Sequence, residues 1–208
     1  MDGSLLNLIE GLIILVVSII MGAILILAPG SIRLQRPECG WVGWIFNIAN
    51  LVFFFLLIPF SGFIRMGLVD ASLLCCFSIP NAALAVALEF TGLLIFLAGA
   101  FLLLWSRLSL RRSFRLGGVK PASSDYLTMH GPYVHMRHPM YLSALLVLLG
   151  VAMLLGSAIL VVTFFIMTYL VLVLIPREEE QLDQAYPVAY AEYCRRVPRS
   201  LFPRLFSP

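Results

Sequence analysis

Long apolar runs separated by short polar segments are the main pattern of the chain. Three runs in the first half have about the 20 residues that a helix needs to cross the hydrocarbon core of a bilayer. They cover residues 5–27, 41–60 and 82–105. Pro29-Gly30 ends the first run, Trp41 and Trp44 are expected interface anchors of the second, and Pro80 precedes the third. The pattern therefore predicts three membrane-spanning helices within residues 1–110.

The second half contains one apolar run, residues 139–175, that is too long for a single crossing. As one helix it would extend about 55 Å, against a hydrocarbon core of about 30 Å. Gly156-Ser157 near its middle is a natural turn. We therefore predict a tight hairpin of residues 141–155 and 158–175, closed by Pro176. Residues 61–79 fit either a loop or a re-entrant segment.

Composition confines this chain of 208 residues to the membrane. Hydrophobic residues make up 61% of it and charged residues 12%, and the mean hydropathy is +0.99. A soluble globular domain does not carry so much apolar surface. The first ten residues contain no lysine or arginine, so the first run is expected to be a retained span, not a cleaved signal peptide. The predicted fold is all-α, a single integral membrane domain over residues 1–208, with a segment 111–208 that carries the chemistry.

The basic residues give the expected orientation. With five spans, thirteen of the fourteen lysines and arginines fall on one side and Arg65 falls alone on the other. By the positive-inside rule, the side with more lysines and arginines is cytoplasmic. This places the N-terminus outside and the C-terminus in the cytoplasm. The net charge of +3 is then a membrane asymmetry, and no nucleic-acid partner is expected.

Polar residues gather on this predicted cytoplasmic side in GPYVHMRHPMY (131–141), PREEEQL (176–182) and YAEYCRRVPRSLFPRLF (190–206). The hairpin brings the first two together. Pro139 suits the first turn of a helix, with His138 near the N-cap. The free N–H groups of that turn and Arg137 would bind an anion, while Glu178–Glu180 would bind a cation. S-adenosylmethionine has a carboxylate, an ammonium and an adenine that could stack on Tyr133 or Tyr141.

Each of these features also has a simpler interpretation. The arginines could anchor helix ends on anionic lipid, and the glutamates could form a solvated helical turn. The tyrosines of the tail, at helical spacing with Leu182, fit an interfacial stripe or a pocket; they are Tyr186, Tyr190 and Tyr193. The histidines lack the ligand spacing of a metal site, so no metal is predicted. Glu10 and Glu89 lie inside apolar runs, where a charge is a functional candidate by default.

Three ordered motifs carry a family resemblance. GPYVHMRHPMY followed by an apolar hairpin, then PREEEQL and a tyrosine-rich helix, then RVPRSLFP, resembles the isoprenylcysteine carboxyl methyltransferase family, which is related to membrane phospholipid N-methyltransferases. The resemblance covers residues 131–203. It implies a cytoplasmic S-adenosylmethionine pocket and a lipophilic substrate that enters laterally between helices. Where that family has Phe-Gly-(Asp/Glu)-Glu-Tyr, this chain has Tyr186-Pro187-Val188-Ala189-Tyr190, and Pro187 predicts a helix break.

The resemblance implies the roles of particular residues. Arg137, Glu178 and Arg196 would be catalytic. The cofactor pocket would be formed by His130, Gly131, Tyr133, His138, Pro139, Tyr141, Glu178, Glu179 and Tyr190.

The predicted activity is methyl transfer from S-adenosylmethionine to a lipophilic or lipidated substrate among membrane lipids, most like isoprenylcysteine carboxyl O-methylation. A carboxylate acceptor needs no base, whereas an amine acceptor must lose a proton, for which Glu178 or Glu179 is available. Phospholipid amine N-methylation is therefore an alternative. An NADPH-dependent membrane reductase and a non-enzymatic membrane helper are two others.

Overall fold

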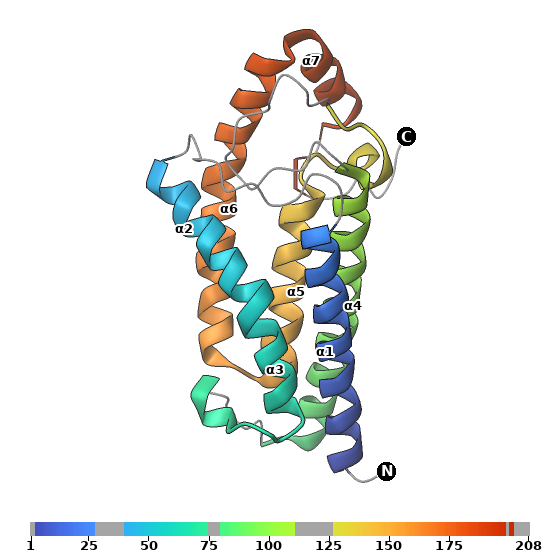
Figure 1. Ribbon diagram of the computed structural model, residues 1–208, viewed down its shortest axis with the longest axis vertical. Coiled ribbons are helices and arrows are strands. Elements are labelled where there is room, and N and C mark those ends of the chain that lie inside the picture. Colours follow the sequence, from blue (N-terminus) through green and yellow to red (C-terminus); the bar gives the residue numbers. More distant parts are fainter. Residues whose placement is uncertain (1–2, 28–39, 75–79, 111–126, 199, 202–208) are drawn as a thin grey trace.

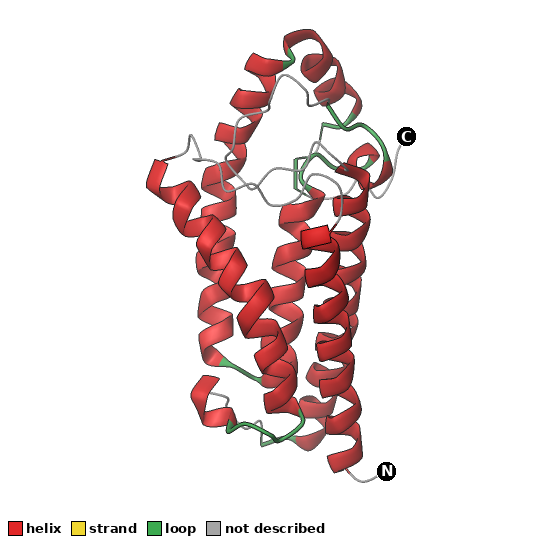
Figure 2. Cartoon of the chain, in the orientation of Figure 1, coloured by secondary structure: helices red, strands yellow, loops and turns green. Residues whose placement is uncertain are grey.

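The computed structural model describes residues 3–27, 40–74, 80–110, 127–198 and 200–201. These residues form an elongated bundle of helices (Figures 1 and 2), and no strand is found among them. The all-α membrane fold predicted from the sequence is confirmed. The predicted loop over 111–126 and most of the basic residues assigned to the cytoplasmic side lie outside the described residues.

Four described helices are long and apolar enough to cross a membrane. Their continuous helical segments are Ser4–Leu27, Gly40–Arg65, Ala82–Leu110 and Ala158–Ala185. They correspond to α1 (Gly3–Leu27), to α2 (Gly40–Val52) continued by η1 (Phe53–Leu57) and α3 (Ile58–Arg65), to α4 (Ala82–Leu110) and to α6 (Ala158–Ala185). The fifth predicted crossing is α5 (Pro139–Leu155), a shorter apolar helix of 17 residues.

The second crossing changes its helical geometry near its middle. The Ile58 N–H reaches back to the Phe53 carbonyl, which is the wider i→i+5 bonding of a π-helix. Pro59 follows directly, and proline supplies no N–H for a regular helical ladder. The helix then continues to Arg65, so the first part of the segment 61–79 is helical. The described remainder forms turns and the short η2 (Ala71–Leu74).

Helices α4 and α5 pack with their backbones close together because glycines face each other. A Cβ placed on Gly99 would lie 2.7 Å from the Val147 nitrogen, and one on Gly92 would lie 2.9 Å from the Gly150 carbonyl. Small residues of this kind allow close helix contact where lipid offers no hydrophobic driving force. The α4–α5 pair is thus a tightly packed support for the residues at its ends.

The turn between α5 and α6 is where the sequence predicted it. Gly156 has a φ of 58°, a left-handed conformation that favours glycine. Ser157 caps α6 by accepting a hydrogen bond from the Leu160 N–H, and its hydroxyl donates to the Leu74 carbonyl at 2.6 Å. The predicted hairpin is therefore confirmed, and η2 is bonded to its turn.

The expected end of the last span at Pro176 is wrong. α6 runs through Pro176 to Ala185. A proline removes one hydrogen bond of a helix, and here the helix nonetheless continues and brings Glu178 and Glu179 into side-chain contacts described below. The predicted break at Pro187 is correct, because α7 (Pro187–Arg196) begins there with the proline in its first turn.

The two hairpin helices differ in length, and this difference determines how deep the polar residues at their ends lie relative to the bilayer core. α5 extends about 26 Å and α6 about 42 Å at 1.5 Å per residue. A core of about 30 Å therefore leaves the start of α5 recessed and the end of α6 projecting beyond the apolar region. Figure 1 shows α6 extending past α5 and continuing into α7.

At the opposite end of the bundle, Glu10 and Glu89 have a common partner. Arg65 Nε donates to Glu10 Oε2 at 2.6 Å, and Arg65 Nη2 donates to Glu89 Oε2 at 2.7 Å. The three residues belong to α3, α1 and α4. Their side chains are 12%, 6% and 29% exposed in the order Arg65, Glu10, Glu89. The two intramembrane carboxylates that the sequence left without partners are thus joined by one guanidinium.

Candidate functional site

Arg137 and Glu179 form the centre of a polar network at the end of the α5–α6 hairpin. Arg137 Nε and Nη2 donate to Glu179 Oε1 at 3.0 and 2.9 Å, and Nη1 donates to the Val197 carbonyl at 2.8 Å. Burial alone would lower the pKa of the Arg137 guanidinium, but hydrogen bonding and the charge of Glu179 raise it above its usual value. Arg137 thus stays cationic, and two of its five N–H donors remain for a ligand.

His138 lies between the two glutamates. Its Nε2 is 3.1 Å from Glu179 Oε1, and its Nδ1 is 3.9 Å from Glu178 Oε2. The predicted N-cap position is confirmed, because His138 directly precedes α5 and Pro139 occupies the first turn. Its ring is buried and stacks on Tyr141, with ring centroids 5.6 Å apart. The packing fixes the imidazole in the one place where it can contact both carboxylates.

The C-terminal tail completes the network through Ser200. Its carbonyl accepts hydrogen bonds from the N–H groups of Arg137 and His138 at 3.1 and 2.9 Å, and its hydroxyl donates to Glu179 Oε1 at 2.8 Å. Oε1 of Glu179 thus has four donors. Ser200 was missed by the sequence reasoning, because a serine within RVPRSLFP has no spacing that marks it.

Glu178 differs from its neighbour Glu179. Its Oε2 accepts a hydrogen bond from the Tyr141 hydroxyl at 2.7 Å, and its side chain is 30% exposed. Among the described residues, neither a lysine nor an arginine pairs with it, and its Oε1 has no hydrogen-bond partner. Glu178 is therefore a positioned carboxylate with an available oxygen beside a balanced Arg137–Glu179 pair.

Two tail tyrosines are buried, which argues against an exposed interfacial stripe, and their place in a cofactor pocket stays a prediction. Tyr190 and Tyr193 are each 4% exposed and pack with Val197. The Tyr193 hydroxyl donates to the Tyr133 carbonyl at 2.8 Å. Burial raises the pKa of the Tyr190 and Tyr193 hydroxyls above their usual range, so both stay neutral donors.

The segment before α5 folds over the end of α4 as η4 (Gly131–Val134). Gly131 has a φ of 64°, and a Cβ there would collide with the Ser109 side chain, so only glycine fits. Tyr133 is buried, which raises the pKa of its hydroxyl well above the usual value, and the charge of Glu178 acts in the same direction. His130 precedes η4 and is exposed, without a contact to the network.

Arg196 is not brought into the network. Its guanidinium pairs with Glu192 on the exposed face of α7, and its side chain is 69% exposed. It lies in the last turn of α7, where a cation interacts favourably with the helix dipole. The other predicted site residues lie at this end of the bundle, and the catalytic role predicted for Arg196 stays a prediction.

Unsatisfied buried oxygens cluster at the same end of the bundle. The side-chain oxygens of Thr128, Gln181 and Tyr190 are buried and have no hydrogen-bond partner among the described residues. Burying such an atom costs about 1–3 kcal/mol when it stays unpaired. Three of them at the end of the bundle that carries Glu178 support the interpretation of this end as a site for a polar ligand.

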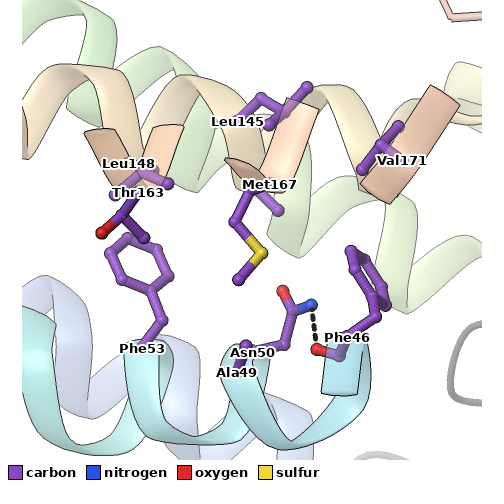
Figure 3. A pocket seen from close by; sticks show the side chains of 10 residues that line it. Phe46, Ala49, Asn50, Phe53, Leu145, Leu148, Thr163, Met167 and Val171 are labelled. Atoms are coloured by element: carbon purple, nitrogen blue, oxygen red, sulfur yellow. Dashed lines mark hydrogen bonds between the residues drawn. The ribbon is translucent and has the colours of Figure 1, made fainter. Parts of the chain in front are cut away.

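An apolar cavity lies below this network, between α2, η1, α5 and α6 (Figure 3). Its enclosed space is small, about 20 Å³, which is room for little more than one water molecule. It is lined by Phe46, Ala49, Asn50, Phe53, Ala144, Leu145, Leu148, Thr163, Met167 and Val171. Phe46 also packs edge-to-face on Tyr141, with ring centroids 5.4 Å apart. One aromatic pair therefore separates the apolar cavity from the carboxylate of Glu178.

A comparison with known families adds an independent finding. Residues 88–189 match the family model described as phospholipid methyltransferase. The match begins in α4 and ends in the first turn of α7, so it contains the hairpin and the residues Arg137, His138, Glu178 and Glu179. This segment, just under half of the chain, is similar to phospholipid methyltransferases.

Proposed function

We propose that the protein is a membrane methyltransferase that uses S-adenosylmethionine and acts on a lipophilic acceptor. Three observations support this: the helical membrane fold, the match of residues 88–189 to phospholipid methyltransferases, and a polar network at the end of the hairpin. The observation that carries most weight is Glu178, held by Tyr141 and without a lysine or arginine partner among the described residues.

The donor set fits this cofactor. Glu178 offers a carboxylate that balances the positive charge of the cofactor's sulfonium, beside which the acceptor would bind. The remaining N–H groups of Arg137 and the buried Tyr190 hydroxyl are donors for its carboxylate. When bound, S-adenosylmethionine supplies an electrophilic methyl group and leaves as a neutral thioether, so no acid is needed to assist departure.

The family match favours an amine as the methyl acceptor, because residues 88–189 are similar to phospholipid methyltransferases. The cofactor carries one net positive charge, which the Glu178 carboxylate balances, so charge alone does not select between an amine and a carboxylate acceptor. The amine must then lose its proton, and Glu178 can accept it. N-methylation of a lipid amine is therefore favoured over the carboxyl O-methylation expected from the resemblance in the sequence.

We also propose an orientation with the network on the cytoplasmic side. This rests on the distribution of basic residues in the sequence, with Arg65 as the single basic residue at the opposite end of the bundle. A cytoplasmic network would have direct access to a cofactor made in the cytoplasm.

Ligand binding to the purified protein in detergent is the first test. Calorimetry should detect S-adenosylmethionine binding to the wild type and to Glu180→Gln, since Glu180 is exposed and outside the network. Binding should be lost in Glu179→Ala, where Arg137 and His138 lose their common partner. NADPH should not bind. Binding of NADPH, or of neither ligand by folded protein, would contradict the proposal and favour a reductase or a helper protein.

Transfer of labelled methyl groups then identifies the acceptor. Phosphatidylethanolamine and a farnesylated cysteine should be compared at equal concentration in mixed micelles. We expect label in the amine lipid. Label in the cysteine ester alone would restore carboxyl O-methylation and contradict the preference for an amine acceptor.

A further inference from the structure

Gln181 is a buried polar side chain that has no role in the cofactor contacts proposed above. Its residue is 8% exposed, and its carboxamide oxygen is buried without a hydrogen-bond partner among the described residues. Thr128 and Tyr190 also have such oxygens, but a hydroxyl can either donate or accept a hydrogen bond. A carboxamide oxygen only accepts. Of these three groups, Gln181 therefore determines most narrowly what its partner must be, namely a donor.

The position of Gln181 on α6 relates it to Glu178. Gln181 comes three positions after Glu178 in this helix, and residues three apart are neighbours on one face. α6 projects beyond the apolar region at this end, so Gln181 lies about 4.5 Å farther along the helix axis, away from the bilayer. The carboxamide is thus next to the available carboxylate, on its aqueous side.

Two other partners for this oxygen fit less well. A hydrogen bond that joins α6 to another part of the protein would need a donor, and the described residues supply none to it. A lipid acceptor would approach Glu178 from the bilayer, whereas Gln181 lies on the other side of Glu178. The partner is therefore better sought in a polar ligand that enters from the water.

The proposed contacts of the cofactor give its order along the site. Its carboxylate is assigned to Arg137 and its sulfonium to Glu178. Arg137 contacts Glu179, and Glu179 is two positions from Gln181, so the two side chains leave α6 on different faces. Gln181 is thus beside the sulfonium but away from the carboxylate, which is where the nucleoside part of the cofactor follows.

The chemistry of adenine matches an isolated buried acceptor. The ring nitrogens of the base accept hydrogen bonds, and its exocyclic amine is the group that donates. A flat, weakly polar ring also suits buried surroundings, and Leu182, next to Gln181 in the chain, packs with the buried tyrosines of α7. A carboxamide oxygen in this place would pair with the amine and reject an acceptor at the same position of the base.

We propose that Gln181 determines the specificity of the cofactor site for adenine, because its carboxamide oxygen accepts a hydrogen bond from the exocyclic amine of the base. Gln181 then distinguishes adenosine from purine nucleosides without that amine. The inference rests on the proposed use of S-adenosylmethionine and adds a contact that the family match does not assign.

The test compares two ligands that differ only in the amine: S-adenosylhomocysteine, and its analogue with hydrogen in place of the exocyclic amine. Calorimetry is carried out on the purified protein in detergent. We expect the wild type to bind the amine-bearing ligand about 5- to 100-fold more tightly, since loss of the donor leaves a buried acceptor unpaired. Gln181→Met has a side chain of similar length without a carboxamide, so it should bind both ligands equally.

Thermal unfolding without ligand separates recognition from a structural role. Gln181→Met replaces an unpaired buried oxygen by apolar atoms, so its midpoint in detergent should equal or exceed that of the wild type. Added S-adenosylhomocysteine should raise the midpoint of the wild type more than that of the variant. A ligand-free variant that unfolds at a clearly lower temperature, or does not fold, would show that Gln181 holds the fold and would overturn the proposal.

The matched control is Gln184→Met on the same helix. Gln184 is exposed and its Nε2 donates to Glu180 Oε1, so this variant should keep the wild-type preference. Equal binding of both ligands by the wild type, or a preference that survives in Gln181→Met, would overturn the role of Gln181. A folded wild type that binds neither ligand nor S-adenosylmethionine would instead contradict the proposed function.

Discussion

The two ends of the bundle each place one arginine near two glutamates, yet the pairings differ. At one end Arg65 contacts both Glu10 and Glu89. At the other, Arg137 contacts Glu179 only, and Glu178 is held by a tyrosine hydroxyl. The first cluster is satisfied within the protein. The second keeps one carboxylate available.

This difference separates a structural ion cluster from a candidate site on physical grounds. A charge in an apolar bundle needs a partner, and Arg65 of α3 supplies it for Glu10 of α1 and Glu89 of α4 at once. Glu178 lies where α6 has left the apolar region and is 30% exposed, so it can stay ionised without a cation. The buried side-chain oxygens without partners among the described residues belong to Thr128, Gln181 and Tyr190, and none of them belongs to the Arg65 cluster.

The largest expected effect comes from removing the available carboxylate. Glu178→Gln keeps an acceptor for the Tyr141 hydroxyl but loses the ability to take a proton. General-base catalysis contributes about 10²–10⁴-fold to rates, so kcat for an amine acceptor should fall by that factor, measured by labelled methyl transfer. Glu180→Gln is the matched control. Unchanged kcat in Glu178→Gln would exclude Glu178 as the base.

Breaking the satisfied cluster should reduce stability. Arg65→Leu leaves the buried Glu10 without a cation, and loss of one partner of a buried pair costs about 3–5 kcal/mol. Thermal unfolding in detergent should show a clearly lower midpoint. The triple variant Glu10→Gln, Arg65→Leu, Glu89→Gln removes all three charges and should recover most of the loss. A single variant as stable as the wild type would show that the cluster does not hold these helices together.

A smaller effect is expected at the tail. Ser200→Ala removes one of four donors to Glu179 Oε1 and leaves the backbone bonds of Ser200 intact. A hydrogen bond to a charged group contributes about 1.5–3 kcal/mol, so S-adenosylmethionine affinity should fall by roughly tenfold or more, read by calorimetry. Ser200→Thr keeps the hydroxyl and should restore binding. Equal affinity in wild type and Ser200→Ala would remove Ser200 from the network's function.

The smallest effect is expected on the exposed face of α7. Arg196→Gln breaks only a surface pair with Glu192, and such pairs contribute about 0–1 kcal/mol. Both the unfolding midpoint and kcat should stay close to wild type. A large loss of kcat with unchanged stability would instead support the catalytic role that the family resemblance assigns to Arg196.

The sequence predicted the helices well because run length and hydropathy are local properties. The hairpin turn at Gly156-Ser157 and the break at Pro187 could be located for the same reason. The prediction that the last span ends at Pro176 was wrong. It rested on the local tendency of proline to end a helix, whereas Glu178 and Glu179 make tertiary contacts beyond that residue. Partners such as Arg65 for Glu10, 55 residues away, depend on how helices are arranged, and no pattern along the chain encodes that.

The α5–α6 turn lies at the opposite end of the bundle from the network that the two helices carry. Each helix therefore acts as a lever arm of about 26 Å or more measured from Gly156. A change of 5° in the angle between the arms would move Glu178 relative to Tyr141 by about 2 Å, enough to separate the 2.7 Å contact between them. The packing at this turn, where the Ser157 hydroxyl bonds the Leu74 carbonyl, is remote from any reacting group, yet small changes there would be enlarged at the proposed site.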